Sequence, residues 1–256
     1  MVPPVADFQK GMGDVAWAAS MLARTPKLWG YVIAPAIVAA VLAIVAIYFL
    51  FSPLLAYTDQ VVGWLPGFLS FIGGILRILV LIPLLGIGYV IFIAAAALCT
   101  APFCEQLSES VEVSLSGKEP PPFSVATLLK DFALGISHSI RRIVSYLLVM
   151  AGLFLLSFIV PLIGALIFTL GGAWMTMRFA AYDALDAVWA RKSLRYADKM
   201  SQLKQVRGRA YGIGATTSLL LLVPGLNLLA MPLAAAAATR LHVEELSGEP
   251  PAAPPA

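Results

Sequence analysis

Charged side chains are scarce in this chain, and four long stretches lack them altogether. Only 12% of the 256 residues are charged, whereas 60% are hydrophobic; soluble domains typically carry about 25% charged residues. Asp, Glu, Lys, Arg and His are all absent from residues 28–58, 78–104, 143–177 and 210–239. A helix of about 20 apolar residues suffices to cross a bilayer. The composition therefore excludes an ordinary soluble enzyme and predicts an integral membrane protein.

Residues that bind metals or act as nucleophiles are also rare. The two cysteines, Cys99 and Cys104, form no CxxC motif, and the two histidines, His138 and His242, are isolated. They indicate neither a disulfide nor a zinc site. The sequence contains no GxSxG, HExxH or Walker motif. We therefore expect no enzymatic activity and no cofactor, and the small, scattered net charge of +3 does not favour nucleic acid as a partner.

The uncharged stretches predict an all-α membrane protein with two long transmembrane helices. The first crossing is expected at about 27–52 and the second, kinked by Pro and Gly, at about 68–101. Residues 1–247 are expected to form a single helical membrane domain. The Pro/Ala-rich tail at 248–256 cannot build a core, and we expect it to be disordered.

Two further apolar segments, at about 142–178 and 210–239, are interrupted by Pro near their middles. The arms of the second are too short to span a hydrocarbon core of about 30 Å. We therefore predict two helical hairpins that penetrate the membrane partly, with their tips shielded from lipid. The predicted tip residues are Pro161, Gly164, Pro224, Gly225 and Asn227.

Two amphipathic segments complete the fold prediction. Residues 5–23 are expected to form either a helix lying in the membrane interface or a helix packed on the protein. In 101–116, apolar residues recur every four positions, and Glu105, Glu109 and Glu112 lie on the other side, where we expect solvent.

The charge distribution predicts how the chain sits in the membrane. If 1–27, 105–142, 178–209 and 240–256 lie on one side, that side holds every Lys and Arg except Arg77. The positive-inside rule makes this side cytoplasmic. We therefore predict a multi-pass membrane protein with both termini in the cytoplasm.

The start of the first crossing is the best candidate for an anion site. A helix that opens near Pro26 would leave the backbone N–H groups of Lys27, Leu28 and Trp29 without helical partners. Free donors and the positive end of a helix dipole attract anions, and Arg24 and Lys27 add two cations. The alternative is that both cations are ordinary cytoplasmic anchors and that Trp29 is an interfacial belt residue.

Other cations are candidates for an anion pathway. Arg77 is the lone charge within a predicted crossing, where it either serves function or reaches the interface with its long side chain. Arg141 and Arg142 belong to a group of arginines beside the apolar stretches. This group either attracts anions and acidic lipids or anchors the helices and pairs with acidic residues. Its other members are Arg178, Arg191, Arg195, Arg207 and Arg209.

Three glycines, Gly208, Gly212 and Gly214, are spaced closely at the start of the last apolar segment. No strand is predicted before them, so they do not form a dinucleotide-binding fingerprint. They predict that a helix packs closely against its neighbours here.

Short motifs in a consistent order span about residues 8–241. The most specific is the ending Pro-x-x-Asn-x-x-x-x-Pro, from Pro224 to Pro232, followed by Ala238 and Thr239. The other matching residues are Pro26, Leu28, Tyr31, Val32, Ile33, Pro35, Ala101, Pro102, Phe103, Glu109, Val111, Glu112, Arg141, Arg142, Pro161, Gly164, Tyr182, Asp183, Arg207, Tyr211, Gly212, Ile213 and Gly214. In these motifs the chain resembles the CysZ-type sulfate permease family, which also includes the eukaryotic etoposide-induced membrane proteins.

The resemblance implies two transmembrane helices with two partly penetrating hairpins, a homo-oligomer in the bacterial inner membrane, and uptake of sulfate or a related oxyanion for cysteine synthesis. The family binds the anion at a Gly-Leu-Arg element that starts the first long helix. Lys27, Leu28 and Trp29 stand at these positions, so the Gly and the Arg are both replaced. The alternative function is a non-transporting membrane protein that organises lipids or partner proteins.

Overall fold

Helices make up the elements of the computed structural model. It describes residues 5–46, 100–117, 143–157, 161–223 and 225–247, with isolated positions between 48 and 88. These ranges contain no strand, in agreement with the predicted all-α class. The tail at 248–256 and most of the predicted crossing at 68–101 lie outside the described residues. So do Arg77, Arg141, Arg142 and Pro224.

The chain divides into two compact units, one of residues 1–32 and 104–256 and the other of residues 33–103. Most of helix α2 (Trp29–Ala46) belongs to the second unit. With the 3-10 turn before it, α2 forms an apolar segment of 21 residues, Pro26–Ala46. At about 1.5 Å per residue this segment is long enough to cross a bilayer. The predicted first crossing is therefore helical as far as the described residues extend.

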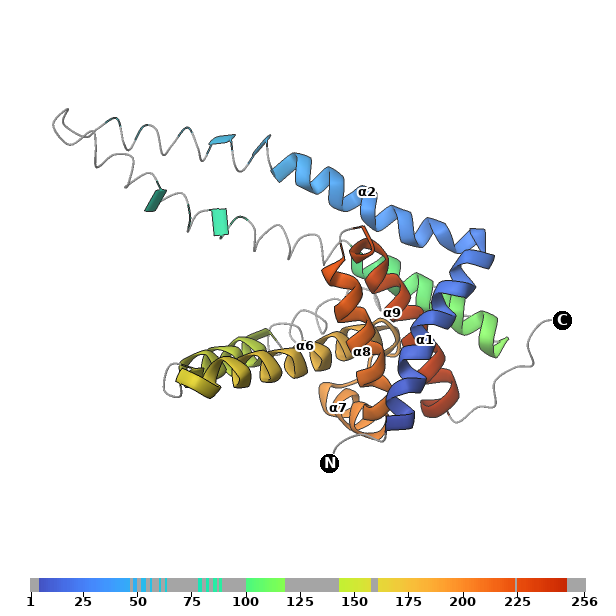
Figure 1. The fold of residues 1–256 in the computed structure, drawn as a ribbon. Coiled ribbons are helices and arrows are strands. Elements are labelled where there is room, and N and C mark those ends of the chain that lie inside the picture. The colour runs from blue at the N-terminus through green and yellow to red at the C-terminus, as the bar shows by residue number, and fades with distance from the viewer. Residues whose placement is uncertain are drawn as a thin grey trace. The chain divides into compact units, whose positions relative to one another are not determined.

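The first unit is built around three helices that lie side by side: α1 (Val5–Arg24), α8 (Arg207–Leu222) and α9 (Asn227–Leu241) (Figure 1). Helix α6 (Pro161–Arg191) packs against α8 and α9. Residues 234–238 of α9 are all alanine, and all are buried. Such small side chains allow α1, α6 and α8 to approach the same helix.

Helix α1 is packed on the protein, the second of the two alternatives given for residues 5–23. Val15, Ala18 and Leu22 are buried, and α1 lies against α8 and α9. Asp14 is buried on the same face. A carboxylate in that position needs a partner, since burying an isolated charge is costly.

Close contacts at two glycines set the position of α8. A Cβ atom added to Gly212 would lie 2.0 Å from the carbonyl oxygen of Phe8 in α1. At Gly214 the added atom would lie 2.2 Å from the carbonyl oxygen of Met177 in α6. Both distances are far below van der Waals contact, so only glycine permits these crossings. The prediction of close helix packing is confirmed at both positions.

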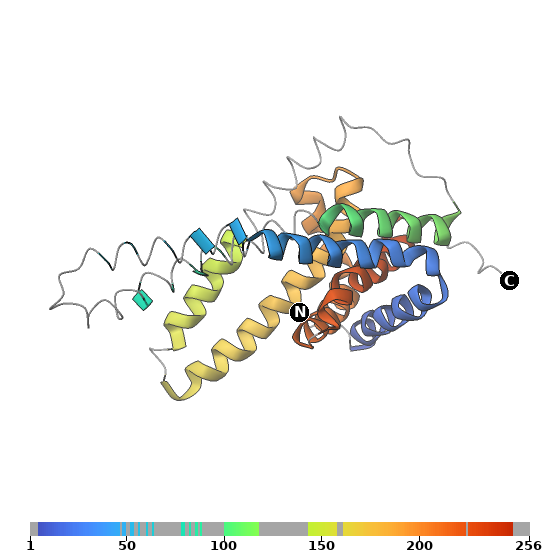
Figure 2. The same ribbon diagram turned by 90° about the horizontal axis from the view of Figure 1, so that it is seen from above.

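The helix Ile143–Ser157 and the first part of α6 lie side by side as a helical hairpin (Figure 2). Near the turn, a Cβ on Gly164 would meet the carbonyl oxygen of Ser157 at 2.4 Å. Farther along, the hydroxyl groups of Tyr146 and Thr176 are 3.4 Å apart. Helix α6 continues past the predicted end of the hairpin, and its span Ile163–Arg191 is also long enough to cross a membrane.

Helices α8 and α9 form the second hairpin, as the prediction for 210–239 requires. Gly225 in the turn has a φ of +88°, a conformation that glycine adopts without strain. Asn227 begins α9, and its N–H donates to the carbonyl of Val223. Leu222 and Leu226 expose apolar side chains at the turn. How deeply either hairpin enters a membrane stays a prediction.

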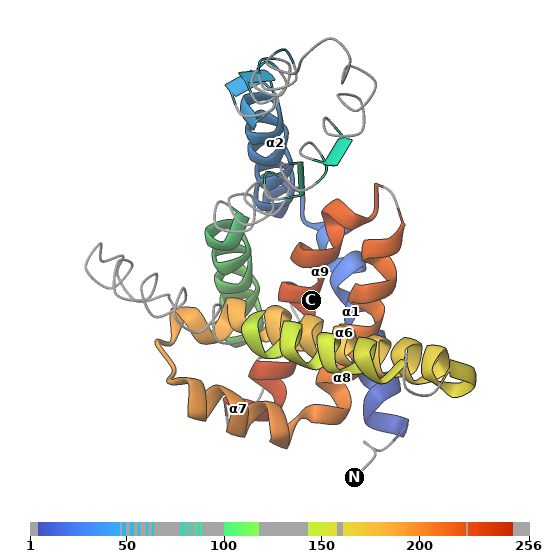
Figure 3. The same ribbon diagram turned by 90° about the vertical axis from the view of Figure 1, so that its left-hand side faces the viewer.

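A short helix, α7 (Tyr196–Gln205), connects the end of α6 to the start of α8 (Figure 3). Its Lys199 is buried and pairs with Asp186 of α6 at 2.6 Å. Asp186 therefore forms an ion pair, with a lysine where an arginine was expected. The side chain of Arg195, just before α7, is exposed.

The packing of α1 on α8 generates a paired prediction. A Cβ on Gly11 would lie 1.9 Å from the carbonyl oxygen of Arg209, whereas nothing lies within 4 Å of one on Gly13. We expect Gly11→Ala to lower the free energy of unfolding by about 1–3 kcal/mol or more. Gly13→Ala should raise it by about 0.5–1 kcal/mol, because alanine favours the helix. Thermal unfolding in detergent measures both, and equal melting temperatures for the two variants would contradict the close crossing.

Candidate functional site

The predicted anion element lies where α1 ends and α2 begins. One turn of 3-10 helix, Pro26–Leu28, joins the two helices. The side chains of Arg24 and Lys27 are exposed at this connection, and neither forms an ion pair with a described residue. Leu28 points the other way and is buried in the core. The local fold therefore presents two positive charges, unpaired by any described acid, on a short turn.

The backbone donors of this element are largely occupied. The N–H of Leu28 donates to the carbonyl of Thr25 at 3.0 Å, and that of Trp29 donates to the carbonyl of Pro26. The indole N–H of Trp29 donates to the carbonyl of Leu22 at 3.1 Å, which holds this side chain against the end of α1. The prediction of three free donors is wrong for Leu28 and Trp29, since 3-10 hydrogen bonds run from i to i−3 and begin sooner. An anion here would be held chiefly by the two cationic side chains.

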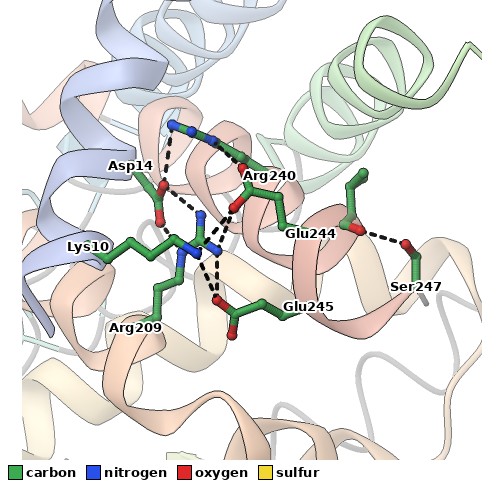
Figure 4. A network of polar contacts seen from close by, with 8 residues as sticks. Lys10, Asp14, Arg209, Arg240, Glu244, Glu245 and Ser247 are labelled. Atoms are coloured by element: carbon green, nitrogen blue, oxygen red, sulfur yellow. Dashed lines mark hydrogen bonds and ion pairs between the residues drawn. The ribbon is translucent and has the colours of Figure 1, made fainter. Parts of the chain in front are cut away.

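A dense group of charges gathers where α1, α8 and the end of α9 meet (Figure 4). The guanidinium of Arg209, 1% exposed, donates to both carboxylate oxygens of Asp14, 2% exposed, at 2.5 and 2.8 Å. Its Nη1 also lies 2.8 Å from carboxylate oxygens of Glu244 and Glu245. A bidentate Arg–carboxylate pair is among the strongest polar contacts in proteins.

Two further cations, Lys10 and Arg240, lie at the edge of this group and balance its negative charges. Arg240 donates to Glu244 at 2.8 Å, and Lys10 lies 3.3 Å from Glu245. Three carboxylates therefore face three cations. Glu244 and Glu245 lie in a π-helix, His242–Leu246, whose wide winding lets two consecutive side chains face the same guanidinium. We call this group the α1–α8 clamp: Lys10, Asp14, Arg209, Arg240, Glu244 and Glu245.

The pKa values in the clamp follow from burial and pairing. Burial by itself would lower the pKa of Arg209, but hydrogen bonds to Asp14 and Glu245 raise it above its usual value. Burial would raise the pKa of Glu244, but contacts with Arg240 and Arg209 lower it instead. Arg209 and Glu244 therefore both remain charged at neutral pH. No local sequence pattern predicts this pairing, because Asp14 and Arg209 are 195 positions apart.

A second polar cluster joins the helix at 100–116 to α6 and α9. Glu112 accepts from Arg191 at 2.7 Å and from Lys192 at 2.8 Å, so its predicted place on a solvated face is wrong. Arg191 also donates to the hydroxyl of Ser108, which lies 2.8 Å from the hydroxyl of Thr239. Burial would raise the pKa of Glu112, but the hydrogen bonds from Lys192 and Arg191 lower it.

His242 adjoins this second cluster and is only 3% exposed. Burial lowers its pKa to about 4, the positive charges of Lys192 and Arg191 act in the same direction, and Glu112 opposes them. The imidazole is therefore neutral at physiological pH.

Cys104 offers little chemistry in this setting. Its thiol is buried, and burial raises its pKa to about 12, so it carries no thiolate at neutral pH. Among the described residues, no three His, Cys, Asp or Glu side chains are placed to share a metal ion.

Comparison with known proteins decides the family. A family model described as Sulfate transporter CysZ/Etoposide-induced protein 2.4 matches residues 15–232. The chain belongs to this family. A Vibrio parahaemolyticus relative named Sulfate transporter CysZ is 32% identical over 227 residues, covering 88% of this chain and 90% of the relative. Two further relatives carry the same name. The protein from Vibrio atlanticus is 32% identical, covering 89% of this chain and 90% of the relative. The protein from Pseudomonas fluorescens is 30% identical, covering 89% of this chain and 91% of the relative.

Several residues that carry the resemblance to the CysZ family lie at packing contacts. Gly212 and Gly214 form the close helix crossings of α8. Glu112 and Thr239 belong to the second polar cluster. Tyr182 is buried with its ring 5.4 Å from that of Trp189. These positions therefore support the packing of this chain.

The α1–α8 clamp generates a prediction about stability. Asp14→Ala leaves Arg209 buried without its bidentate partner, and we expect a loss of about 3–5 kcal/mol in the free energy of unfolding. Asp7→Ala is the control, because Asp7 is an exposed acid on the same helix. Adding Arg209→Met to Asp14→Ala should restore part of the loss, since the stranded charge is removed. Thermal unfolding measures all of these variants, and a loss no greater than that of the control would contradict the role of the clamp.

The buried, neutral His242 generates a prediction about pH. Below about pH 6.5 the unfolded chain protonates this residue, whereas the folded chain does so only near pH 4. Stability is therefore lost as the pH falls, by about 2 kcal/mol between pH 7.5 and pH 5. The lowered pKa values of Glu112 and Glu244 act in the same direction at lower pH. His242→Gln should lose less stability over this interval, as followed by melting temperature; identical pH dependence of the two proteins would contradict a buried neutral imidazole.

Proposed function

We propose that this protein is a channel or permease that carries sulfate or a related oxyanion across the bacterial inner membrane and so supplies sulfur assimilation. The observation that carries the proposal is the match to relatives named Sulfate transporter CysZ along about nine tenths of both chains. A match of this extent includes the membrane helices as well as the packed helices around α8. The two apolar helical spans, Pro26–Ala46 and Ile163–Arg191, support a location in a membrane.

In this proposal the anion is first held at the start of α2. Arg24 and Lys27 are exposed there without a paired acid among the described residues, so their field is available to an anion. Leu28, buried below them, and Trp29, bonded to the end of α1, hold the turn in place.

The replacement of the family's arginine has a consequence for selectivity. A guanidinium matches two oxygens of an oxyanion in a fixed plane, whereas the ammonium of Lys27 acts as a point charge. The element therefore attracts anions by charge more than by shape. We expect it to distinguish sulfate only weakly from other oxyanions of similar size and charge.

The proposed orientation has both termini in the cytoplasm. The contacts of Asp14 with Arg209 and Arg240 support the view that the N-terminal helix and the end of α9 share one side of the membrane. The positive-inside rule makes this side cytoplasmic. We further propose that the protein is a homo-oligomer, that both hairpins enter the bilayer only partly, and that Arg77, Arg141 and Arg142 lie along the anion pathway.

Uptake of radioactive sulfate into proteoliposomes tests the function. We expect the purified protein to raise uptake well above that of empty liposomes. The double variant Arg24→Ala, Lys27→Ala should lower the initial rate about tenfold, because both attracting charges are removed. The control is Arg195→Ala, Lys204→Ala, which removes two exposed cations at the two ends of α7.

The outcomes separate the function from its site. Uptake equal to that of empty liposomes would contradict sulfate transport. Uptake that is unchanged by the Arg24 and Lys27 substitutions, or lowered equally by the control, would leave transport intact and contradict the anion element.

A further inference from the structure

The second polar cluster contains buried nitrogen atoms that lack hydrogen-bond partners. Nη2 of Arg191 is engaged by Glu112 and Ser108, but its buried Nε–H has no partner among the described residues. Nδ1 of His242 is likewise buried without a partner in the described part of the chain. A buried polar group left unsatisfied costs about 1–3 kcal/mol, so such atoms commonly face a bound ion or water.

The charges of the cluster do not cancel. Arg191 and Lys192 both point at a single carboxylate, that of Glu112, which leaves an excess of one positive charge. This balance differs from that of the α1–α8 clamp, where three cations face three carboxylates. The excess charge attracts an anion, and the limited access around it strengthens the attraction by excluding water.

The side chains of the cluster differ in their exposure to solvent. The side chain of Lys192 is 36% exposed and that of Arg191 is 16% exposed, whereas His242 is almost completely buried. Solvent therefore reaches Lys192, which lies beside the deeper groups of the cluster.

The hydroxyl pair holds the guanidinium in its orientation. Ser108 accepts from Nη2 of Arg191 and lies 2.8 Å from Thr239, which is bonded to the carbonyl of Ala235 in α9. Because Ser108 and Thr239 are completely buried, Nη2 is fixed and the Nε–H keeps one direction. Preorganised donors of this kind bind anions without the entropic cost of ordering a long side chain.

We propose that Arg191, Lys192 and His242 form a binding site for a small tetrahedral oxyanion, separate from the element at the start of α2. The Nε–H of Arg191 and the ammonium of Lys192 donate to the anion, and His242 adds its Nδ1–H. Glu112 remains beside the site and moderates its affinity, as suits an ion that must also leave. The proposed transport function supplies only the identity of the anion, sulfate; the site itself rests on the contacts of this cluster.

Equilibrium binding of radioactive sulfate to the full-length protein in detergent tests this inference. We expect two sulfate ions per chain in the wild type and one in the double variant Glu112→Gln, Arg191→Gln, which removes the buried ion pair without stranding either charge. Arg195→Gln, which removes one positive charge from an exposed side chain four residues from Arg191, should still bind two. Arg191→Lys keeps the charge but lacks the Nε–H, and it should weaken one of the two sites about tenfold.

A competition experiment with lipid identifies whether the oxyanion is a free ion or part of a lipid headgroup. Micelles that contain phosphatidylglycerol are added to the sulfate-loaded protein. Sulfate retained at this site indicates a free inorganic ion, and sulfate displaced indicates a lipid phosphate; both results support an oxyanion site. Melting temperatures verify that each variant is folded.

The binding counts separate the two proposals. One sulfate in the wild type that is lost only with Arg24→Ala, Lys27→Ala would overturn the new site and leave the transport proposal standing. One sulfate that is lost only with Glu112→Gln, Arg191→Gln would support the new site and contradict the element at the start of α2. If folded wild-type protein binds no sulfate, the inference is overturned, whereas proteoliposome uptake still decides transport.

Discussion

The ion pair between Asp14 and Arg209 is the contact on which the first unit depends. Two charges that are almost completely removed from water are costly unless their hydrogen bonds are met, and four N–H···O contacts from one guanidinium meet them here. The pair joins α1 to α8 at the point where Gly11 brings the two backbones together. Because α1 leads directly into the turn with Arg24 and Lys27, the same contact also anchors the proposed anion element.

Three groups of cations in the described part of the chain differ in their surroundings. In the clamp every positive charge faces a carboxylate, so the group contributes to packing and orientation and leaves no net field. At the start of α2 the cations are exposed and unopposed by described acids, and around Arg191 one positive charge is left over. Local charge balance, rather than the number of arginines, therefore separates structural cations from those available to an anion.

Much of the fold was accessible from the sequence, since local patterns determine it. Uncharged stretches predicted the helices around 27–52, 142–178 and 210–239, and the glycine spacing predicted the close crossings of α8. The pairing of charges was not accessible, because partners such as Asp14 and Arg209 meet only after the chain has folded. Glu112 followed the helical pattern of a solvated residue, but the end of α6 covers it. The free donors at Leu28 and Trp29 were overestimated because a 3-10 turn cannot be distinguished from an α-helical start by residue type.

The 195 positions between Asp14 and Arg209 also impose an order on biosynthesis. At a synthesis rate of about 5–20 residues per second, Asp14 leaves the ribosome roughly 10–40 s before its partner. During this interval α1 presents an unpaired carboxylate beside the apolar residues Val15, Ala18 and Leu22, while the first membrane helix is already being inserted. Helix α1 is thus made well before α8, the helix that carries its buried partner. A chain truncated before α8 would therefore lack both the guanidinium that neutralises Asp14 and the backbone against which Gly11 packs.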